Sequence, residues 1–240
     1  MRIALVGYGK MGKRIETLAS ENGDEISHRI TTSNMAEIST IRNTDVIIEF
    51  TRPDAAIANY KMLAPLGIPI VTGTTGWNKD LTEVEKLVEK YKIPFFYASN
   101  FSVGIHITLA VNNYLAAMMK KFPDYDARIE EWHHTEKKDA PSGTAITLAE
   151  GLIKNHTDYA EYGMTARNAG EKTLPVISHR EDEIPGTHEI IYQSDVDEIS
   201  IKHTALNRDG FALGAMKAAD FVRNQKPGIY TMNHLLNTSL

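Results

Sequence analysis

Cysteine is absent from all 240 residues, which excludes disulfide bonds, thiol catalysis and cysteine-ligated zinc or iron–sulfur centres. Long apolar runs are also missing, and none approaches the roughly 20 residues that a membrane-spanning helix needs. Glycines follow the short apolar run at the N-terminus at once, so we expect no signal peptide. Basic residues are not in excess, because 31 acidic and 26 basic side chains give a net charge of −5. We therefore expect a soluble, cytoplasmic protein that binds neither nucleic acid nor a membrane.

The first hundred residues alternate between short apolar runs and amphipathic stretches. Helical spacing of apolar residues predicts helices over 10–22 and 79–92, and a third helix should begin near Pro53, a residue suited to a first helical turn. The apolar runs between them predict strands over 2–7, 25–31, 44–51, 68–75 and 93–100. This alternation indicates an α/β domain of the Rossmann-like class, in which helices cover both faces of a parallel sheet.

The strand–helix alternation ends after residue 100. We expect a long apolar helix over 104–122 and a strand over 126–134, followed much later by an antiparallel hairpin over 188–195 and 197–205. The intervening stretch 157–187 is polar and is expected to be irregular, with loops or hairpin ends over 168–175 and 179–188. A final helix over 210–225 should precede a short tail.

These elements predict two domains. Residues 1–102 and 211–240 would form a dinucleotide-binding domain, with the C-terminal helix packing back on the N-terminal part. Residues 103–210 would form an inserted α+β domain with a mixed or antiparallel sheet, which would bind the substrate.

The segment "GYGKMG" places Gly7, Gly9 and Gly12 in the G-x-G-x-x-G spacing, after an expected strand and at the start of an expected helix. In this context the spacing is typical of a dinucleotide-binding loop. Gly7 would permit the tight turn, Gly9 the approach of a pyrophosphate, and Gly12 close packing of the helix on the sheet. The phosphates would then meet N–H groups at the positive end of the helix dipole. The alternative is a tight turn that binds no ligand.

An acidic residue at the end of the second strand usually binds the adenosine ribose of NAD. The corresponding segment here, "SHRITTSN", contains no acid. Its cationic and hydroxyl side chains would suit a 2′-phosphate instead: Arg29, Thr31, Thr32 and Ser33, with Lys10 and Lys13 nearby. We therefore expect use of NADPH, or of both NADPH and NADH, unless these residues are only a solvated loop.

Three further segments follow expected parallel strands and should line the same crevice. They are 50–54, 72–77 and 98–104, and the last would also serve as a hinge into the second domain. Taken singly, each segment could be ordinary turn chemistry.

The stretch "EEWHHTEKKDAPSGTA" at 130–145 crowds histidines, lysines and acids before a helix. In a continuing strand His133 and His134 would point to opposite faces, so the strand should end there and the chain should turn. Such a turn would bring Lys137 back toward the histidines. Pro141 indicates a helix start, which places "SGT" (142–144) at a helix N-terminus, where N–H groups can hold a carboxylate or phosphate.

Metal binding is the rival interpretation of this stretch. Adjacent histidines are poorly spaced for chelation from one element, and no H-x-x-x-H motif or clear carboxylate partner accompanies them. We therefore expect no metal, and we expect Glu130, Glu131 and Glu136 to be solvated. A plain polar turn with an N-cap at Ser142 is the simplest alternative.

The segments "GYGKMG", "GTTG", "ASNFSVG" and "EEWHHTEKKDAPSGTA", in this order, resemble those of the 4-hydroxy-tetrahydrodipicolinate (dihydrodipicolinate) reductases. The resemblance extends over essentially the whole chain, including "AGEKTLP", "GTHEI" and the closing helix. The string of two histidines, a lysine and D-A-P-S-G-T is highly specific to that family, whereas the glycine loop is not. The resemblance implies NADPH- or NADH-dependent reduction of a small cyclic dicarboxylate in lysine and diaminopimelate biosynthesis. It also implies a homotetramer assembled through the second domain.

The resemblance also implies roles for individual residues. His133 and Lys137 would be the catalytic pair, with the histidine as acid or base and the lysine as proton donor or electrostatic stabiliser. His134, Ser142, Gly143 and Thr144 would hold the substrate carboxylates. The cofactor would contact the glycine loop and the strand ends through Gly7, Tyr8, Gly9, Lys10, Met11, Gly12, Arg29, Thr31, Phe50, Thr51, Gly73, Thr74, Thr75, Ser99, Asn100 and Phe101.

Other classes of protein fit these residues less well. An aspartate-semialdehyde dehydrogenase normally needs a cysteine nucleophile, and neither it nor a homoserine dehydrogenase carries the histidine–lysine–S-G-T string. A dinucleotide-sensing regulator would leave that string unexplained and would usually bring a DNA-binding element, of which the sequence shows no pattern. The expected mechanism is hydride transfer to the substrate ring followed by protonation, a step suited to a histidine.

Overall fold

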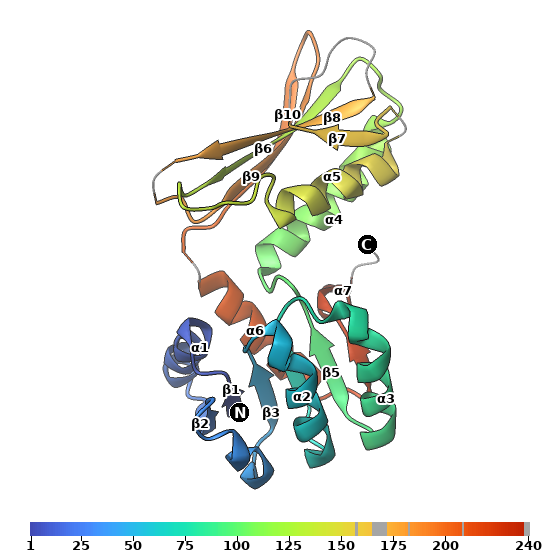
Figure 1. Ribbon diagram of the computed structural model, residues 1–240. Coiled ribbons are helices and arrows are strands. Elements are labelled where there is room, and N and C mark those ends of the chain that lie inside the picture. The colour runs from blue at the N-terminus through green and yellow to red at the C-terminus, as the bar shows by residue number, and fades with distance from the viewer. Residues whose placement is uncertain (157, 165–171, 182, 208, 238–240) are drawn as a thin grey trace. The chain divides into compact units, whose positions relative to one another are not determined.

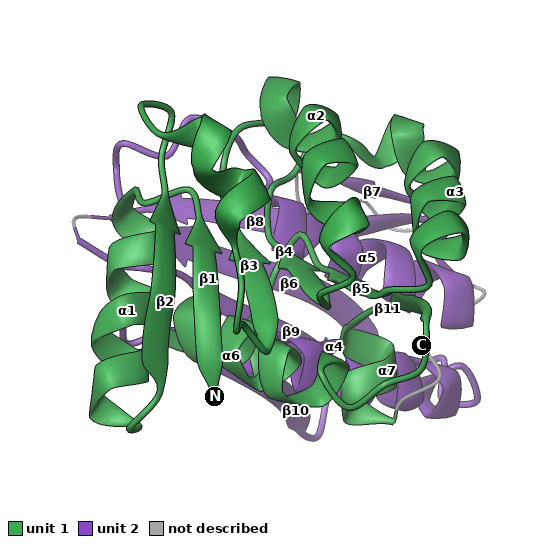
Figure 2. Ribbon diagram, turned by 90° about the horizontal axis from the view of Figure 1, so that it is seen from below, with its two compact units in different colours: residues 1–103, 209–239 green, residues 104–208, 240 purple. Residues whose placement is uncertain are grey.

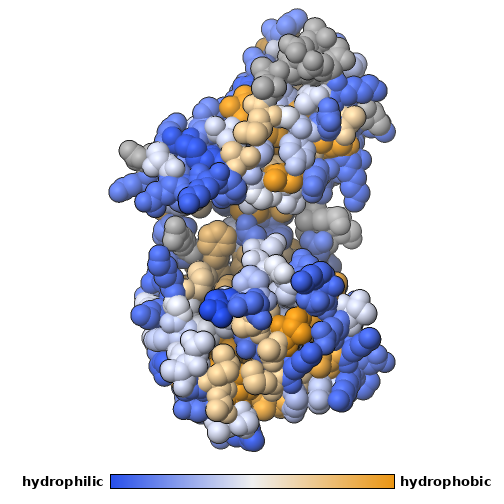
Figure 3. Space-filling model, in the orientation of Figure 1, coloured by the Kyte–Doolittle hydropathy of each residue, from blue (hydrophilic) through white to orange (hydrophobic). Residues whose placement is uncertain are grey.

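The computed structural model describes residues 1–156, 158–164, 172–181, 183–207 and 209–237. The chain divides into two compact units, and Figure 2 distinguishes them by colour. Unit 1 comprises Met1–Val103 together with Asp209–Ser239, and unit 2 comprises Gly104–Arg208. Within the described ranges, no helix is both long and apolar enough to cross a membrane. On the side seen in Figure 3, hydrophilic residues cover most of the surface of each unit.

Unit 1 is built on a parallel sheet of six strands in the order β11-β5-β4-β3-β1-β2 (Figure 1). The strands are β1 (Arg2–Val6), β2 (Glu25–Ile30), β3 (Val46–Glu49), β4 (Ile70–Thr72), β5 (Pro94–Tyr97) and β11 (Gly228–Tyr230). The helices are α1 (Lys10–Glu21), α2 (Pro53–Leu63), α3 (Leu81–Tyr91), α6 (Asp209–Val222) and α7 (Met232–Leu236), with 3₁₀ turns at Met35–Thr40, Ala64–Leu66 and Asn78–Asp80. The predicted Rossmann-like architecture is confirmed.

A separate apolar cluster packs the helices against each face of this sheet. On one face α1 and α6 pack through Ile15, Leu18, Ala215 and Ala219. On the other face α2 and α3 contribute their own buried residues, Ala56, Tyr60, Leu63, Val84 and Val88. The sheet is therefore covered on both sides, as burial of a parallel sheet requires.

Unit 2 is a five-stranded mixed sheet in the order β10-β9-β6-β8-β7, with two helices. Its elements are α4 (Val103–Met119), β6 (Asp126–His133), α5 (Gly143–Asn155), β7 (Glu161–Gly163), β8 (Thr173–Arg180), β9 (Thr187–Gln193) and β10 (Glu198–Thr204). The β9–β10 hairpin is antiparallel, as predicted, with Glu198 opposite Gln193. Both helices pack on one face of the sheet, where Ala116, Met119, Leu148 and Leu152 meet Ile129, Val176 and Ile190.

Two sequence-based expectations are wrong. The stretch expected to be irregular contains β7 and the eight-residue strand β8, which pairs in parallel with β6. A proline inside the run, Pro175, argues against a strand, because proline cannot donate a ladder hydrogen bond. The expected loop over 168–175 falls partly on residues 168–171, which lie outside the described residues. The short tail after α6 in turn forms β11 and α7, and β11 extends the parallel sheet beside β5.

Candidate active site

Strand β6 carries Glu131 and His133 on the face that packs toward α4 and α5. Alternate residues of this strand are buried, and the pattern ends with Glu131 at 0% exposure and His133 at 8%. The strand stops at His133, so the two histidines are separated as expected. His134 is half-buried, and its N–H donates to the Ile184 carbonyl at 3.0 Å.

Glu131 is the most enclosed ionisable group of this region, and the expectation that it is solvated is wrong. Its Oε2 lies 2.6 Å from Nδ1 of His133, and its Oε1 accepts from the Arg180 guanidinium at 2.9 Å. The backbone N–H of Ser142 also donates to Oε1, at 3.2 Å. Burial would raise the pKa of Glu131, but the contacts with His133, Ser178, Ser142 and Arg180 lower that pKa well below its usual range. The carboxylate is therefore ionised.

Of the other two acids, Glu136 is exposed as expected. Glu130 lies on the opposite face of β6, where it pairs with Arg128 at 2.9 Å and with His179 at 3.2 Å. The sequence could not rank these three acids, because strand parity alone decides which of two adjacent glutamates enters the interior.

Ser142 is the N-cap of α5, as the sequence predicts. Its Oγ accepts from the N–H of Ala145 at 3.2 Å and lies 3.1 Å from Nε2 of His188. The N–H of Ser142 is used by Glu131, so the first-turn N–H groups of Gly143 and Thr144 are the ones with no recorded partner among the described residues. These two groups are available to an external anion.

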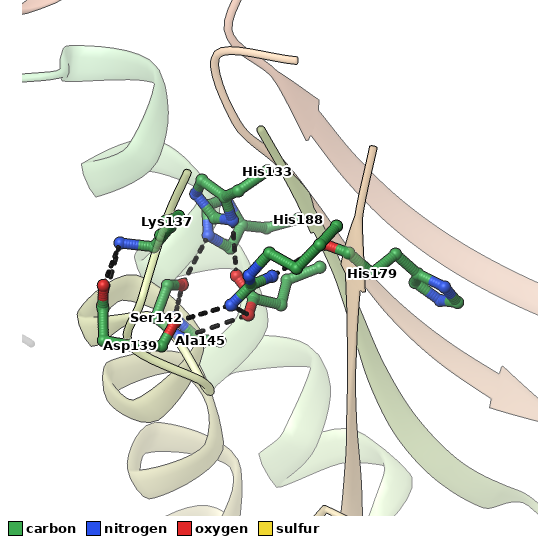
Figure 4. Close-up of polar contacts among 9 residues, drawn as sticks. His133, Lys137, Asp139, Ser142, Ala145, His179 and His188 are labelled. Carbon is green, nitrogen blue, oxygen red and sulfur yellow. Dashed lines mark hydrogen bonds and ion pairs between the residues drawn. The ribbon is translucent and has the colours of Figure 1, made fainter. Parts of the chain in front are cut away.

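His188 on β9 completes the cluster (Figure 4), and the sequence analysis did not single it out. It is paired in register with Glu131, and its ring centroid lies 5.1 Å from that of His133. Burial lowers the pKa of His188 to about 4, and the neighbouring His133 contributes to the shift. His188 is therefore neutral at neutral pH. Most residues of β9 are buried, so no alternation along this strand could have marked His188 in the sequence.

Lys137 lies in the turn that follows β6, where its N–H donates to the His134 carbonyl at 3.1 Å. The ammonium group bonds to Asp139, with Nζ–O distances of 2.8 and 2.9 Å, and points away from His133 (Figure 4). The predicted turn is thus present, and the side chain of Lys137 is held by a carboxylate two residues away.

Glu131, His133 and His188 form the one group of potential metal ligands found among the described residues. The Glu131 oxygen and the His133 nitrogen already touch at 2.6 Å. An ion between them would need about 2 Å to each atom and hence a wider spacing. The other carboxylate oxygen is occupied by a guanidinium, a cation that disfavours a second positive charge. The geometry fits an internal ion-pair network better than a metal centre.

The glycine loop of unit 1 has the form that a dinucleotide needs. Gly7 has φ +94°, and a side chain there would lie 1.9 Å from the Phe50 carbonyl oxygen. A side chain at Gly12 would lie 2.4 Å from the Gly7 carbonyl oxygen, so α1 packs closely against the strand end. Gly9 faces open space and is the N-cap of α1, which has no side-chain cap. The loop residues fit a pyrophosphate group at this helix end.

Arg29, at the end of β2, is paired with an acidic residue. Its guanidinium bonds to the carboxylate of Glu16 on α1, with Nε at 2.9 Å, and the Tyr8 hydroxyl donates to the same carboxylate. Arg29 holds the pKa of Glu16 below its usual range. The sequence-based view of this end of the sheet as purely cationic is therefore incomplete, because an acid reaches it from the neighbouring helix. Lys10 and Lys13 are exposed, and Thr31 bonds to Asn34 and Ser33.

The loops after β3 and β4 are joined to each other. The N–H of Thr51 donates to Oγ1 of Thr74 at 2.7 Å, and the Thr51 hydroxyl bonds to the buried carboxylate of Glu49. Gly73 is required here because a side chain would lie 2.0 Å from the Phe50 ring. Thr75 is exposed beside them.

The remaining predicted cofactor residues follow β5. Ser99 is exposed, and Asn100 Oδ1 accepts from the N–H of Ser102 at 2.8 Å. Phe101 is 2% exposed and packs on Phe50 and Phe96, with ring centroids 5.8 and 5.9 Å away. The side chain of Phe101 thus belongs to the core of unit 1, and only its backbone is placed to meet a ligand.

The fold and these two sets of residues define a class, the two-unit oxidoreductases with a Rossmann-like unit that uses a nicotinamide cofactor. Comparison with known families narrows the class. The models of the N- and C-terminal parts of dihydrodipicolinate reductase match residues 1–101 and 104–236. The chain belongs to the dihydrodipicolinate reductase family.

Individual relatives agree with this assignment. The chain is 40% identical over 237 residues to the 4-hydroxy-tetrahydrodipicolinate reductase of Christiangramia forsetii, covering 99% of this chain and 98% of the relative. It is 38% identical over 202 residues to that of Nitratiruptor sp., covering 82% and 78%. A dipicolinate-bound dihydrodipicolinate reductase structure from Paenisporosarcina sp. TG-14 matches with a TM-score of 0.76 at 22% identity, covering 96% of this chain and 97% of that one. That last likeness shows the shared fold.

Proposed function

We propose that the chain reduces 4-hydroxy-tetrahydrodipicolinate to tetrahydrodipicolinate with a nicotinamide cofactor, in lysine and diaminopimelate biosynthesis, as its family name indicates. One observation carries the proposal at the level of residues. In unit 2 a single buried carboxylate, that of Glu131, joins the imidazole of His133 to the first turn of α5. A proton donor and an anion-binding helix end are thereby fixed to each other.

The substrate carboxylates would bind to the N–H groups of Gly143 and Thr144, with the hydroxyl of Ser142 and the imidazole of His134 beside them. Support for this assignment comes from the helix N-terminus, where these two N–H groups have no recorded partner among the described residues. Two such donors and the helix dipole favour an anion over a neutral ligand.

The bound nicotinamide supplies the hydride. The glycine loop of unit 1 would hold its pyrophosphate, and the loops that contain Thr51, Gly73 and Asn100 would border its other end. His133 would deliver the proton that completes the reduction. Lys137 would stabilise negative charge as it develops on the substrate, which requires its ammonium group to leave Asp139.

The test compares three single substitutions by steady-state kinetics with freshly generated substrate. His133→Ala and Lys137→Ala should each lower kcat by about 100-fold, the range expected for loss of a proton donor or of a transition-state contact. Lys138→Ala is the matched control, because Lys138 is exposed and adjacent in sequence, and it should retain wild-type turnover. Near-wild-type turnover of both active-site variants, with an intact fold, would overturn the assignment.

The cofactor is proposed to be NADPH or NADH, with Arg29 and Glu16 deciding between them. A guanidinium at the end of β2 suits a 2′-phosphate, whereas a carboxylate at the same place suits the ribose hydroxyls of NADH. Both groups are present and bonded to each other. This pairing supports use of both coenzymes, since neither charge acts alone.

A homotetramer assembled through unit 2 is also proposed. Both described helices of unit 2 pack on one face of its sheet, so no described helix of that unit covers the second face. That face carries Trp132 stacked on His179 at 4.7 Å, with Nζ of Lys202 5.3 Å from the Trp132 ring centroid. Ordered aromatic and ion-paired side chains of this kind favour contact with other subunits.

A further inference from the structure

Glu131 uses both of its carboxylate oxygens, and each reaches a different part of the site. Oε2 lies 2.6 Å from Nδ1 of His133 in an ion-pair contact, and within the described residues neither atom forms a hydrogen bond of regular geometry. Oε1 accepts from the N–H of Ser142 and from the guanidinium of Arg180. The two oxygens of this buried side chain therefore face the imidazole of His133 on one side and the start of α5 on the other.

Arg180 anchors the carboxylate and also the turn that contains Lys137. It lies at the end of β8 and is paired in register with His133 at the end of β6. The same terminal nitrogen that binds Glu131 donates to the Asp139 carbonyl at 2.6 Å. Asp139 in turn holds the ammonium group of Lys137. A buried ion pair thus links the strand end, the turn and the helix start.

A carboxylate on one imidazole nitrogen decides what the other nitrogen can do. With Nδ1 held as the N–H that faces Glu131, the proton that enters and leaves the ring must be carried by Nε2. Nε2 is next to Gly186, where a side chain would lie only 3.0 Å from it. Gly186 has φ +152°, and its lack of a side chain keeps that side of the ring clear.

We infer that Glu131, anchored by Arg180, is a positioning residue for the reduction: it fixes His133 with Nδ1 inward, which makes Nε2 the proton-donating atom, and it fixes Ser142 at the start of the substrate-binding turn. This inference rests on the proposed role of His133 as proton donor. It assigns a task to two residues that neither contact the substrate in the proposal nor belong to the histidine–lysine–S-G-T string.

The groups that set the charge around His133 come from every neighbouring element. They are Glu131 on the same strand, Arg180 on β8, His188 on β9, His203 opposite His188 on β10, and Lys137 in the turn. Among the residues that the structure describes, Glu131 is the one anion in direct contact with the ring. Its neutralisation should therefore make the protonated imidazole less stable.

The experiment compares Glu131→Gln with Glu130→Gln across a range of pH. The two substitutions are identical in chemistry and adjacent on β6, but Glu130 lies on the opposite face and does not contact His133. Glu131→Gln should lower kcat by about 10- to 100-fold. It should also move the basic limb of the kcat profile to lower pH, because the carboxylate that faces the proton donor loses its charge. Glu130→Gln should stay within about two-fold of wild type, with assembly of both variants checked by light scattering.

The shift of the basic limb distinguishes a positioning role of Glu131 from a purely structural role. A structural role at the N-terminus of α5 would raise KM and leave the limb in place, and that result would overturn the inference. A second measurement uses the wild-type enzyme, so a variant that fails to fold does not end the test. Nitrogen-15 NMR chemical shifts of the His133 ring, measured at a pH where the ring is neutral, should show Nδ1 protonated and Nε2 unprotonated. The opposite tautomer would overturn the inference.

Failure of the proposed function would look different. If His133→Ala keeps its turnover, the proton-donor assignment is wrong whatever the tautomer of the ring. If His133→Ala loses its turnover while Glu131→Gln retains kcat and the pH profile of the wild type, the donor assignment stands and the positioning role of Glu131 is overturned.

Discussion

At the scale of residues, the charged groups that surround the proposed proton donor include side chains that no motif marks. The sequence string identifies His133, Lys137 and Ser142 to Thr144, and the structure gathers them around the end of β6 and the start of α5. Glu131 could not be selected in this way, because two adjacent glutamates look alike until the faces of the strand are known. His188 lies more than 50 residues from His133 along the chain and meets it only through strand pairing.

The Glu16–Arg29 pair yields a prediction on coenzyme preference, expressed as the ratio of kcat/KM for NADPH to that for NADH. Glu16→Gln should raise this ratio on the order of 10-fold, because it removes a negative charge that competes for Arg29. Arg29→Ala should lower it by a similar factor. Glu21→Gln, at the exposed end of the same helix, is the control and should leave the ratio unchanged. Equal ratios in all four proteins would show that this pair does not contact the adenosine end.

The buried His188 predicts how stability depends on pH. Its pKa is lowered to about 4 in the folded chain, against 6.5 for an ordinary histidine side chain, so the unfolded chain binds the proton more tightly between these pH values. The stabilisation is complete above pH 6.5 and should be lost as the pH falls toward 4, by on the order of 3 kcal/mol. Glu131, with its lowered pKa, adds a further loss only below about pH 4.5.

Urea unfolding at several pH values checks this prediction. His188→Gln should flatten the dependence between pH 6.5 and 4.5. Ser142→Ala is a matched control, since it removes the hydroxyl that meets Nε2 of His188 but leaves the imidazole in place, and it should keep the slope. An unchanged slope in His188→Gln would assign the titration to another group.

At the scale of elements, the sequence was sufficient where local pattern and tertiary role agree. The strand–helix alternation of unit 1 was predictable, because buried parallel strands are short apolar runs and their helices are amphipathic. Strand β8 was not, since Pro175 and its polar C-terminal half conceal a strand whose pairing with β6 fixes it. Strand β11 has only three residues and depends on β5 beside it. Tertiary pairing decided both elements.

The N-terminus of α5 yields a prediction at this scale. Ser142→Ala removes the Oγ that accepts from the N–H of Ala145 and meets His188, so the free energy of unfolding at pH 7 should fall by about 1–2 kcal/mol. The KM for substrate should rise, because Gly143 and Thr144 follow directly. Ser39→Ala, which removes an exposed hydroxyl from a 3₁₀ turn of unit 1, should change the free energy of unfolding by less than about 0.5 kcal/mol. The free energy of unfolding is measured by urea unfolding. If it falls by a similar amount in both variants, the N-cap at Ser142 does not contribute more to stability than an ordinary exposed hydroxyl.

At the scale of the whole molecule, the proposed cofactor residues and the proposed substrate residues lie in different units, and the chain passes between the units near Val103 and near Asp209. The proposed cofactor residues belong to a sheet covered on both faces, whereas the proposed substrate residues belong to a sheet of which the described helices cover one face. Burial of an ordered, partly aromatic face usually stabilises an oligomer. Assembly should therefore involve unit 2 and spare unit 1.

Arg128 provides the test of this expectation. It lies on the uncovered face of β6 and pairs with Glu130 at 2.9 Å and with Glu198 at 3.5 Å. Arg128→Glu would place three carboxylates together on that face, and like charges in an interface cost several kcal/mol. The proposed tetramer should then dissociate to smaller species, with a lower mass by sedimentation velocity at about 10 μM protein. Arg52→Glu makes the same change in an exposed ion pair of unit 1, with Asp54, and should retain the wild-type mass. If both variants keep the mass of the wild type, the face that carries Arg128 is not where the subunits meet.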